Sequence, residues 1–291
     1  MLTALLEQIV NGFIIGGIYV LVALGMALIF GVMQVFNFAH GVLFTAGGYI
    51  CYFVFYKLIG NYPASIALSM FAVGLLGLVL EMAVFRRLRD NVSMQIVASL
   101  GLILIIQNGV VALWGPQALQ MRVLPAQIIL RFGPLSFTAQ HAVIIATVAA
   151  TVTLLHLFLT RSRLGTAIRA ISQNPDAALV VGVDSNRIFL LTFATAGALA
   201  ALGGALIGPL FLIFPQMGDL PLLKALTAIV LGGMGSVPGA IIGGFAIGIV
   251  ESVSTLFIPT DFRDTVVFSL LILVLLIKPR GLFGVRIRGE A

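Results

Sequence analysis

The sequence predicts an all-α, polytopic membrane protein with about eight membrane-embedded helical segments. Of its 291 residues, 60% are hydrophobic and only 9% are charged. Apolar windows of about 20 residues recur along the chain, and each is long enough, at about 1.5 Å per residue, to cross a hydrocarbon core of about 30 Å. These windows are far longer than the roughly ten-residue alternating segments of a transmembrane β-barrel. Helices are therefore expected, because each helix satisfies its own backbone hydrogen bonds within lipid.

The hydrophobic windows follow one another along most of the chain. They lie at residues 9–32, 40–58, 62–85, 94–114, 141–160, 188–210, 222–257 and 264–279. We predict that residues 1–291 form a single transmembrane domain with two longer connections. One is an external loop at about 115–140, preceded by Trp114 at the expected membrane interface, and the other is a cytoplasmic loop at about 161–187.

The positions of the basic residues indicate the orientation in the membrane. With the N-terminus outside, eleven of the 16 Lys and Arg residues lie on the cytoplasmic side, as the positive-inside rule favours. They are Arg86, Arg87, Arg89, Arg161, Arg163, Arg169, Arg187, Lys278, Arg280, Arg286 and Arg288. We therefore predict an external N-terminus and a cytoplasmic C-terminus. Such ends require an odd number of crossings, so one or two segments should be broken or re-entrant.

The long window 222–257 is the first candidate for such a break. Gly235 and Pro238 lie within its "LGGMGSVPGAIIGG" run and should interrupt a straight helix. Broken helices at membrane depth often surround a transport pathway, which makes Gly235 a candidate pathway or gate residue. Close helix packing is the alternative, because small residues recur at every fourth position. These residues are Gly235, Gly239 and Gly243, and likewise Gly244 and Gly248.

A second interruption lies in residues 34–49. Asn37 and His40 follow the first window with no charged loop between, which indicates a tight return near the inner face. These two side chains either satisfy backbone groups at the return or belong to a pathway or gate. We expect no metal site, because His141 and His156 are remote in sequence and no carboxylate lies at ligand spacing.

Polar residues inside the windows are few. The fourth window carries a polar face, formed by Gln95, Ser99, Gln107 and Asn108. Hydrogen bonds between helices would explain this face, and so would a route for a neutral or zwitterionic solute. Glu251 is a carboxylate well inside the long window, and it would either face a cavity or pair with Arg263.

Several kinds of chemistry are not indicated. No lysine follows the G-x-x-x-x-G-K-[ST] pattern of a nucleotide-binding loop, and neither H-E-x-x-H nor G-x-S-x-G occurs. The single cysteine, Cys51, cannot build a disulfide or a metal cluster within the chain. The basic residues are scattered rather than clustered, so a nucleic-acid partner is not expected. We expect neither an enzyme nor a cofactor.

A short helix is predicted within the loop 161–187. Asn174 is a favourable N-cap, and Pro175 suits the first helical position. Asp176 complements the positive end of the helix dipole, and Gly182 suits the position after the C-terminus. The helix would expose Ala177, Ala178, Leu179, Val180 and Val181. Because so short a helix is marginal alone, it should dock on a partner protein, on its own bundle or in the headgroup plane.

Four sequence motifs follow one another along the chain. They are "ALGMALIFGVMQVFNFAHG", "AISQNPDAALVVGVDSNRIFLLTFATAGALAALGGALIG", "KALTAIVLGGMGSVPGAIIGG" and the closing "KPRGLFG". Together they cover stretches from residue 23 to residue 284. In this combination the chain resembles the branched-chain amino acid ABC-transporter permease family, of the LivH type.

The resemblance implies a multi-pass protein of the bacterial inner membrane that serves an importer. In such an importer, two permease chains, often related but different, sit on two cytoplasmic ATP-binding subunits and receive solute from an external substrate-binding protein. Residues 174–182 would then form the ATPase-coupling helix. Members carry branched-chain or other neutral amino acids, urea or amides, and the lack of a long N-terminal extension favours amino acids. A urea or amide permease and a stand-alone secondary transporter are the alternatives.

Overall fold

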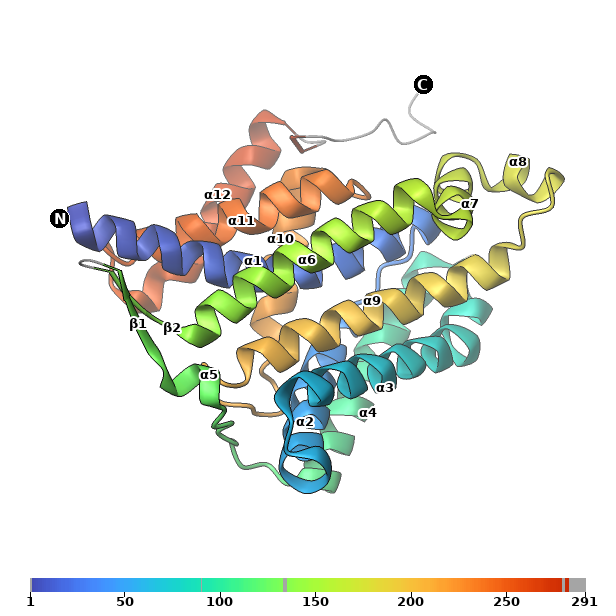
Figure 1. Ribbon diagram of the computed structural model, residues 1–291. Coiled ribbons are helices and arrows are strands. Elements are labelled where there is room, and N and C mark those ends of the chain that lie inside the picture. The colour runs from blue at the N-terminus through green and yellow to red at the C-terminus, as the bar shows by residue number, and fades with distance from the viewer. Residues whose placement is uncertain (1, 90, 133–134, 279–280, 283–291) are drawn as a thin grey trace.

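The computed structural model of the protein describes residues 2–89, 91–132, 135–278 and 281–282. It is a bundle of helices in which the N-terminus and helix α8 lie at opposite ends (Figure 1). The α-helices are α1 (Leu2–Met33), α2 (His40–Val54), α3 (Tyr62–Ala83), α4 (Val92–Trp114), α5 (Leu124–Gln127), α6 (Ala139–Arg161), α7 (Arg163–Gln173), α8 (Pro175–Val180), α9 (Ser185–Ile207), α10 (Asp219–Gly232), α11 (Val237–Ser254) and α12 (Arg263–Ile277). The other elements are β1 (Ile129–Phe132), β2 (Leu135–Thr138), the π-helix η1 (Phe55–Ile59), and the 3-10 helices η2 (Phe85–Leu88) and η3 (Thr260–Phe262).

Seven described helical stretches are long and apolar enough to cross a membrane. They are Thr3–Met33, His40–Ile59, Tyr62–Leu88, Val92–Trp114, Ala139–Arg161, Ser185–Ile207 and Val237–Ser254. The prediction of a polytopic, all-α membrane protein is therefore confirmed. α10 and α12 contain 14 and 15 residues. At 1.5 Å per residue they are only about 21–23 Å long, which is less than a hydrocarbon core of about 30 Å.

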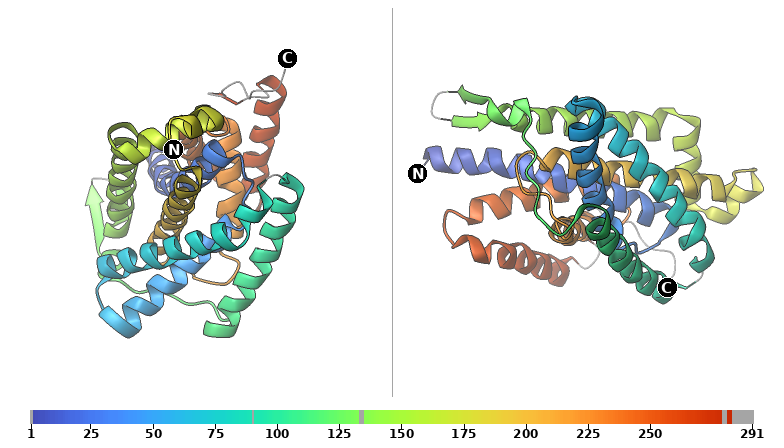
Figure 2. Two further views of the ribbon diagram at one scale, coloured as in Figure 1. Left: turned by 90° about the vertical axis from the view of Figure 1, so that its right-hand side faces the viewer. Right: turned by 90° about the horizontal axis from the view of Figure 1, so that it is seen from below.

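α1 is the central helix of the bundle. Its residues 18–24 are buried, and it packs against α6, α9, α10 and α11 (Figure 2). α3 runs along α9, where an ideal Cβ at Gly77 would lie 2.5 Å from the carbonyl oxygen of Phe193. α4 and α6 are peripheral, since only 11% of the hydrophobic window of each is buried within the chain. Their outer faces must therefore be covered by lipid or by another protein.

The predicted break in the window 222–257 is confirmed. α10 ends at Gly232 and α11 begins at Val237, with Gly233 and Gly235 between them at φ 103° and 82°, a region that favours glycine. The Ser236 hydroxyl then accepts a hydrogen bond from the Gly239 N–H at 3.1 Å and caps α11. The two helices fold back on each other as an antiparallel hairpin.

The glycines of α11 allow close packing on two sides, as the small-residue spacing predicts. Gly239 and Gly243 contact the backbone of α10, at Gly232 and Ala228 respectively. Gly248 instead contacts the backbone of Gly16 in α1. A side chain at any of these positions would overlap the neighbouring helix, so the packing interpretation of these glycines holds.

The return after α1 is more extended than the predicted tight turn. The chain leaves α1 at Met33 and resumes a helix only at His40, whose ring lies beside Gly25. Gly25 is eight residues before the end of α1, which corresponds to about 12 Å along the helix axis. The residues between the two helices therefore run back along α1. They bring the N-terminus of α2 into the interior of the bundle.

The loop at about 115–140 contains structure that the all-α prediction omitted. β1 and β2 pair antiparallel, with Ile129 opposite Thr138 and Phe132 opposite Leu135. Leu119 forms an isolated bridge to Ile213, in the connection between α9 and α10. Backbone hydrogen bonds of 2.8 Å in both directions join Leu119 and Ile213. The loop is thus tied to the end of the bundle near the N-terminus (Figure 1).

Candidate functional site

The capped helix predicted in the loop 161–187 is present as α8. The Asn174 side chain accepts a hydrogen bond from the Ala177 N–H at 3.2 Å, and Pro175 occupies the first turn. Asp176 also lies in this first turn, and Gly182 follows the helix with a φ of 84°. Local sequence determines this helix, because each end is fixed by residues within it or next to it.

The exposed face of α8 differs from the expected one at a single position. Leu179, Val180 and Val181 are 56%, 88% and 76% exposed. Ala178 is only 3% exposed, so the expectation that its side chain is exposed is wrong. One side of α8 packs against α7 and α9 of the same chain, and Ala178 lies on that side. The larger apolar residues lie on the outer side. α8 lies at the far end of the bundle from the N-terminus (Figure 1).

Helix α7, which joins α6 to α8, is not anticipated by the sequence analysis. Ser162 caps it by accepting a hydrogen bond from the Gly165 N–H at 2.8 Å, and Ile168 and Ile171 are buried against the bundle. The apolar residues three positions apart are a helical signal that could have revealed it. α7 packs against α1, α6 and α9 and also contacts α8.

A charged cluster lies where the turn after α3 meets the start of α9. The fully buried Glu81 pairs with Arg89 and also lies 3.6 Å from Arg86. Arg89 donates a 2.7 Å hydrogen bond to Asn186, and its guanidinium lies 4.4 Å from the ring centroid of Phe189. This cluster attaches the beginning of α9, the helix that follows α8, to α3 and α4.

The polar face of α4 is occupied by hydrogen bonds within the protein. The Gln95 amide donates to the carbonyl oxygens of Leu88 and Arg89 at 3.0 and 3.1 Å. Ser99 and Asn108 bond to carbonyl groups of their own helix. These bonds are local and are not the hydrogen bonds between helices that one interpretation of this face expected.

Gln107 is the member of the α4 face that reaches another helix. Its amide donates a 3.0 Å hydrogen bond to Asp219 at the start of α10. Burial raises the pKa of the Asp219 carboxyl, and the hydrogen bond from Gln107 acts in the opposite direction. None of the four residues of the α4 face is among those that line the two cavities described below.

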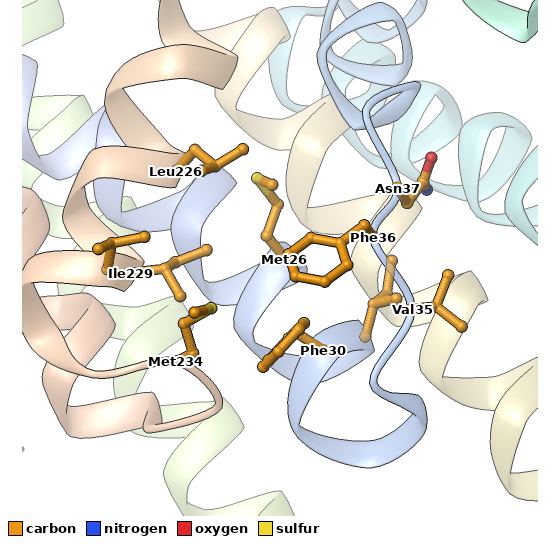
Figure 3. A pocket seen from close by; sticks show the side chains of 10 residues that line it. Met26, Phe30, Val35, Phe36, Asn37, Leu226, Ile229 and Met234 are labelled. Carbon is orange, nitrogen blue, oxygen red and sulfur yellow. The ribbon is translucent and has the colours of Figure 1, made fainter. Parts of the chain in front are cut away.

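Asn37 and His40 are buried at the return between α1 and α2. Neither side-chain atom of the Asn37 amide has a hydrogen-bond partner among the described residues, so it does not satisfy backbone groups there as one interpretation expected. Asn37 lies at the edge of an apolar cavity of about 30 Å³, into which Phe30 and Phe36 project (Figure 3). Gly235 lies against Gly31 of α1 and does not line this cavity.

Glu251 lies in a second charged cluster, where α1, α10, α11 and α12 meet. It is 3% exposed, and one carboxylate oxygen is 2.5 Å from the Lys224 ammonium. Its other oxygen accepts a 2.8 Å hydrogen bond from the Tyr19 hydroxyl. Lys224 also lies 2.8 Å from Asp264, and Arg263 approaches Glu251 at 3.5 Å. Pairing with Arg263 is therefore confirmed, although Lys224 is the closer partner.

Glu251 also lines a cavity of about 300 Å³. The sequence left a cavity and an ion pair as alternatives, and the structure contains both. The cavity is lined by Gln8, Asn11, Ile14, Ile15, His141, Leu210, Phe211, Glu251, Ser252, Thr255 and Arg263. The sequence does not indicate that Lys224, Asp264 and Tyr19 belong to this cluster, because their proximity depends on how α10, α11 and α12 fold back on α1. The helix break before α11 is the signal that could have suggested the Lys224 pairing.

These features define a class of protein: a multi-pass α-helical membrane protein with a polar cavity in its bundle and an exposed apolar helix at one end. The chain belongs to the family described as branched-chain amino acid transport system, permease component, which matches residues 8–275. It is thus a permease component and not an enzyme, and it is a multi-pass protein of the bacterial inner membrane.

Individual relatives are similar over nearly their whole length. The high-affinity branched-chain amino acid transport system permease protein BraD of Pseudomonas aeruginosa is 34% identical, over 96% of this chain and 95% of BraD. The corresponding LivH protein of Escherichia coli K12 is 32% identical, over 96% and 95%. The ribose import permease protein RbsC of Bacillus subtilis is 31% identical over 44% of this chain and 42% of RbsC. No solved structure gives a significant match.

Proposed function

We propose that this chain is the membrane-spanning subunit of an ABC importer that moves a branched-chain or other small neutral amino acid inward. Movement occurs by alternating access of the spans, driven by ATP hydrolysis on a separate chain. The observation that carries this proposal is that α8 and the residue after it present Leu179, Val180 and Val181 to the outside. The substrate class is supported by relatives named as branched-chain amino acid permeases.

The proposal assigns α8 to a groove on a cytoplasmic ATP-binding subunit. Burying a Val or Leu side chain contributes about 1.5–3 kcal/mol, so three such residues favour a stable contact. Force applied to α8 would reach α9 directly and, through the Arg89 cluster, α3 and α4. The residues proposed for this role are Asn174, Pro175, Asp176, Ala177, Ala178, Leu179 and Gly182, with Val180 and Val181.

Further partners are part of the proposal. Two ATP-binding subunits, a second permease chain that is related but different, and an external substrate-binding protein would complete the importer. The exposed apolar faces of α4 and α6 leave room for a second membrane subunit as well as for lipid.

Transport by the reconstituted complex tests the proposal. The chain is co-expressed with its neighbouring transport subunits, purified, and placed in proteoliposomes with the binding protein and labelled L-leucine, L-alanine or urea. We expect accumulation of an amino acid that needs ATP and survives collapse of ion gradients. Uptake by the chain alone, dependent on an ion gradient, would contradict the proposal. ATP-driven uptake of urea alone would retain the ABC assignment and replace the solute.

A further inference from the structure

The cavity beside Glu251 has two kinds of wall. Gln8, Asn11, Glu251, Ser252 and Arg263 provide polar or charged groups. The other wall is apolar and consists of Ile14, Ile15, Leu210 and Phe211. Its volume of about 300 Å³ lies at the lower end of the roughly 300–1,000 Å³ typical of small-molecule sites. The apolar cavity at Asn37, at about 30 Å³, is too small for any amino acid.

The two cations of the cluster differ in how closely they approach the carboxylates. Lys224 is held between two carboxylates, at 2.5 Å from Glu251 and 2.8 Å from Asp264. Arg263 lies farther from the same carboxylates, at 3.5 and 3.9 Å, which exceeds the roughly 2.7–2.9 Å of a charge-assisted hydrogen bond. Its side chain is also the most exposed of the four, at 38%. Both approaches use Nε, so the terminal N–H groups of Arg263 can donate hydrogen bonds to a planar carboxylate.

The four charges of the cluster sum to zero, and this favours one kind of ligand. If Arg263 binds a carboxylate, Lys224 is left with two carboxylates and the remaining cluster carries one net negative charge. An ammonium group on the same ligand would restore neutrality beside Glu251. A ligand with only one charged group would leave an uncompensated charge in a largely buried site, which is costly.

Neutral polar groups complete the polar wall. The Gln8 carbonyl accepts a 2.7 Å hydrogen bond from Ser252, and this leaves the Gln8 amide hydrogens as donors. The Nδ1 atom of His141 accepts from the Thr138 N–H at 3.3 Å, so a neutral His141 carries its proton on Nε2 and is a further donor. An aliphatic side chain would contact the apolar wall.

We infer that this cavity is a binding site, within a single permease chain, for the zwitterion of a small neutral amino acid. The carboxylate binds the terminal nitrogens of Arg263, the ammonium lies beside Glu251, and the aliphatic side chain packs against Ile14, Ile15, Leu210 and Phe211. The inference rests on the proposed function and adds to it the residues that hold the solute on its way through the membrane.

Protection of an introduced cysteine tests the site without relying on transport. The native Cys51 is buried, so Asn11→Cys supplies one reactive thiol on the cavity wall. We expect L-leucine, at about ten times its Kd, to slow alkylation of this thiol by N-ethylmaleimide about ten-fold. The matched control, Gln117→Cys in the exposed loop, should be unaffected by L-leucine.

Analogues with one charge test the zwitterion without any change in the cavity beyond the reporter cysteine. Isocaproate keeps the carboxylate of leucine and lacks the ammonium, whereas leucinol keeps the ammonium and lacks the carboxylate. Neither should protect at the concentration where L-leucine does.

Arg263→Gln should weaken L-leucine protection about 10- to 100-fold, because a charge-assisted contact is lost. Arg122→Gln, which removes an exposed arginine away from the cavity, should leave it unchanged.

The two levels of proposal fail in different ways. If labelled amino acid accumulates with ATP but no amino acid protects Asn11→Cys, the site is wrong and the importer function stands. If L-leucine protects the cysteine but ATP-driven uptake is absent, the importer function is wrong and the site stands. Equal protection by isocaproate or leucinol would overturn the zwitterion assignment, as would full L-leucine protection in Arg263→Gln.

Discussion

At the scale of residues, a buried ion pair and two glycines determine how α10, α11 and α1 meet. Lys224 and Glu251 are charged and almost fully buried, so each depends on the other for compensation. Gly243 and Gly248 have no side chain, which lets α11 contact α10 and α1 at backbone distance. Lipid tails are as apolar as the surfaces of the helices, so the hydrophobic effect does little to make helices associate within a membrane. Specific contacts such as these therefore decide which helices pack together.

Removing one member of the buried pair should be worse than removing both. Lys224→Met leaves Glu251 and Asp264 short of one cation, and breaking a buried pair costs about 3–5 kcal/mol. The double variant Lys224→Met, Glu251→Gln should regain part of that loss. Thermal unfolding of the purified chain in detergent measures both, with Lys57→Met as the exposed control. A double variant as unstable as the sum of the two single variants would refute this coupling.

A methyl-bearing side chain at Gly248 should separate α11 from α1. Gly248→Val would place its Cβ against the Gly16 backbone, which cannot move aside without shifting a helix. Overpacking of this kind costs about 1–3 kcal/mol or more. The same substitution at Gly109, which has open space around it in α4, is the control. Equal melting temperatures for the two variants would show that the α1–α11 contact is looser than described.

At the scale of elements, the capping residues set where α8 begins and ends, but the helix is too short to be stable by itself. Six helical residues gain little from hydrogen bonding alone, so the helix depends on Ala178 packing inward and on whatever covers its outer face. Its position after α7 and before α9 connects any force on it to two helices of the bundle.

Charge on the outer face of α8 should release the ATP-binding subunit. Leu179→Asp and Val180→Asp each remove buried apolar area from the proposed contact, and each should weaken association about 10- to 100-fold. Co-purification of the ATPase with the tagged permease measures this. Ser172→Asp adds the same charge on the exposed surface of α7 and should co-purify normally. Normal ATPase recovery with Val180→Asp would remove the coupling role from α8.

At the scale of the whole molecule, the predicted orientation has direct consequences for labelling. Gln117→Cys lies in the loop at about 115–140 and Val180→Cys lies in α8, at the other end of the bundle from the N-terminus. With the N-terminus outside, a membrane-impermeant maleimide should label position 117 in intact cells and position 180 only after permeabilisation. The unmodified chain is the control, because Cys51 is buried. The reverse pattern would invert the orientation.

Much of this architecture follows from local sequence. Hydropathy located the spans, and Gly235 and Pro238 marked the break between α10 and α11. The Asn174 cap and Gly182 located α8. α7 and the β1–β2 hairpin were missed, because their signals are short and moderately polar and they lie outside the hydrophobic windows. The exposure of Ala178 was misjudged, since the sequence does not state which side of a two-turn helix faces the bundle.

Local sequence accounts for the class of protein, the spans, the helix break and the capped helix, because each depends on residues within a few turns of one another. The closest partners of Glu251, which are 27 residues away at Lys224 and 232 residues away at Tyr19, come near it only in the folded chain. In the folded chain Gln95 and Ser99 bond to nearby backbone, and neither lines either of the two cavities described above. The reason is that contacts between helices are set by how the whole chain folds back on α1, and no local window contains that information.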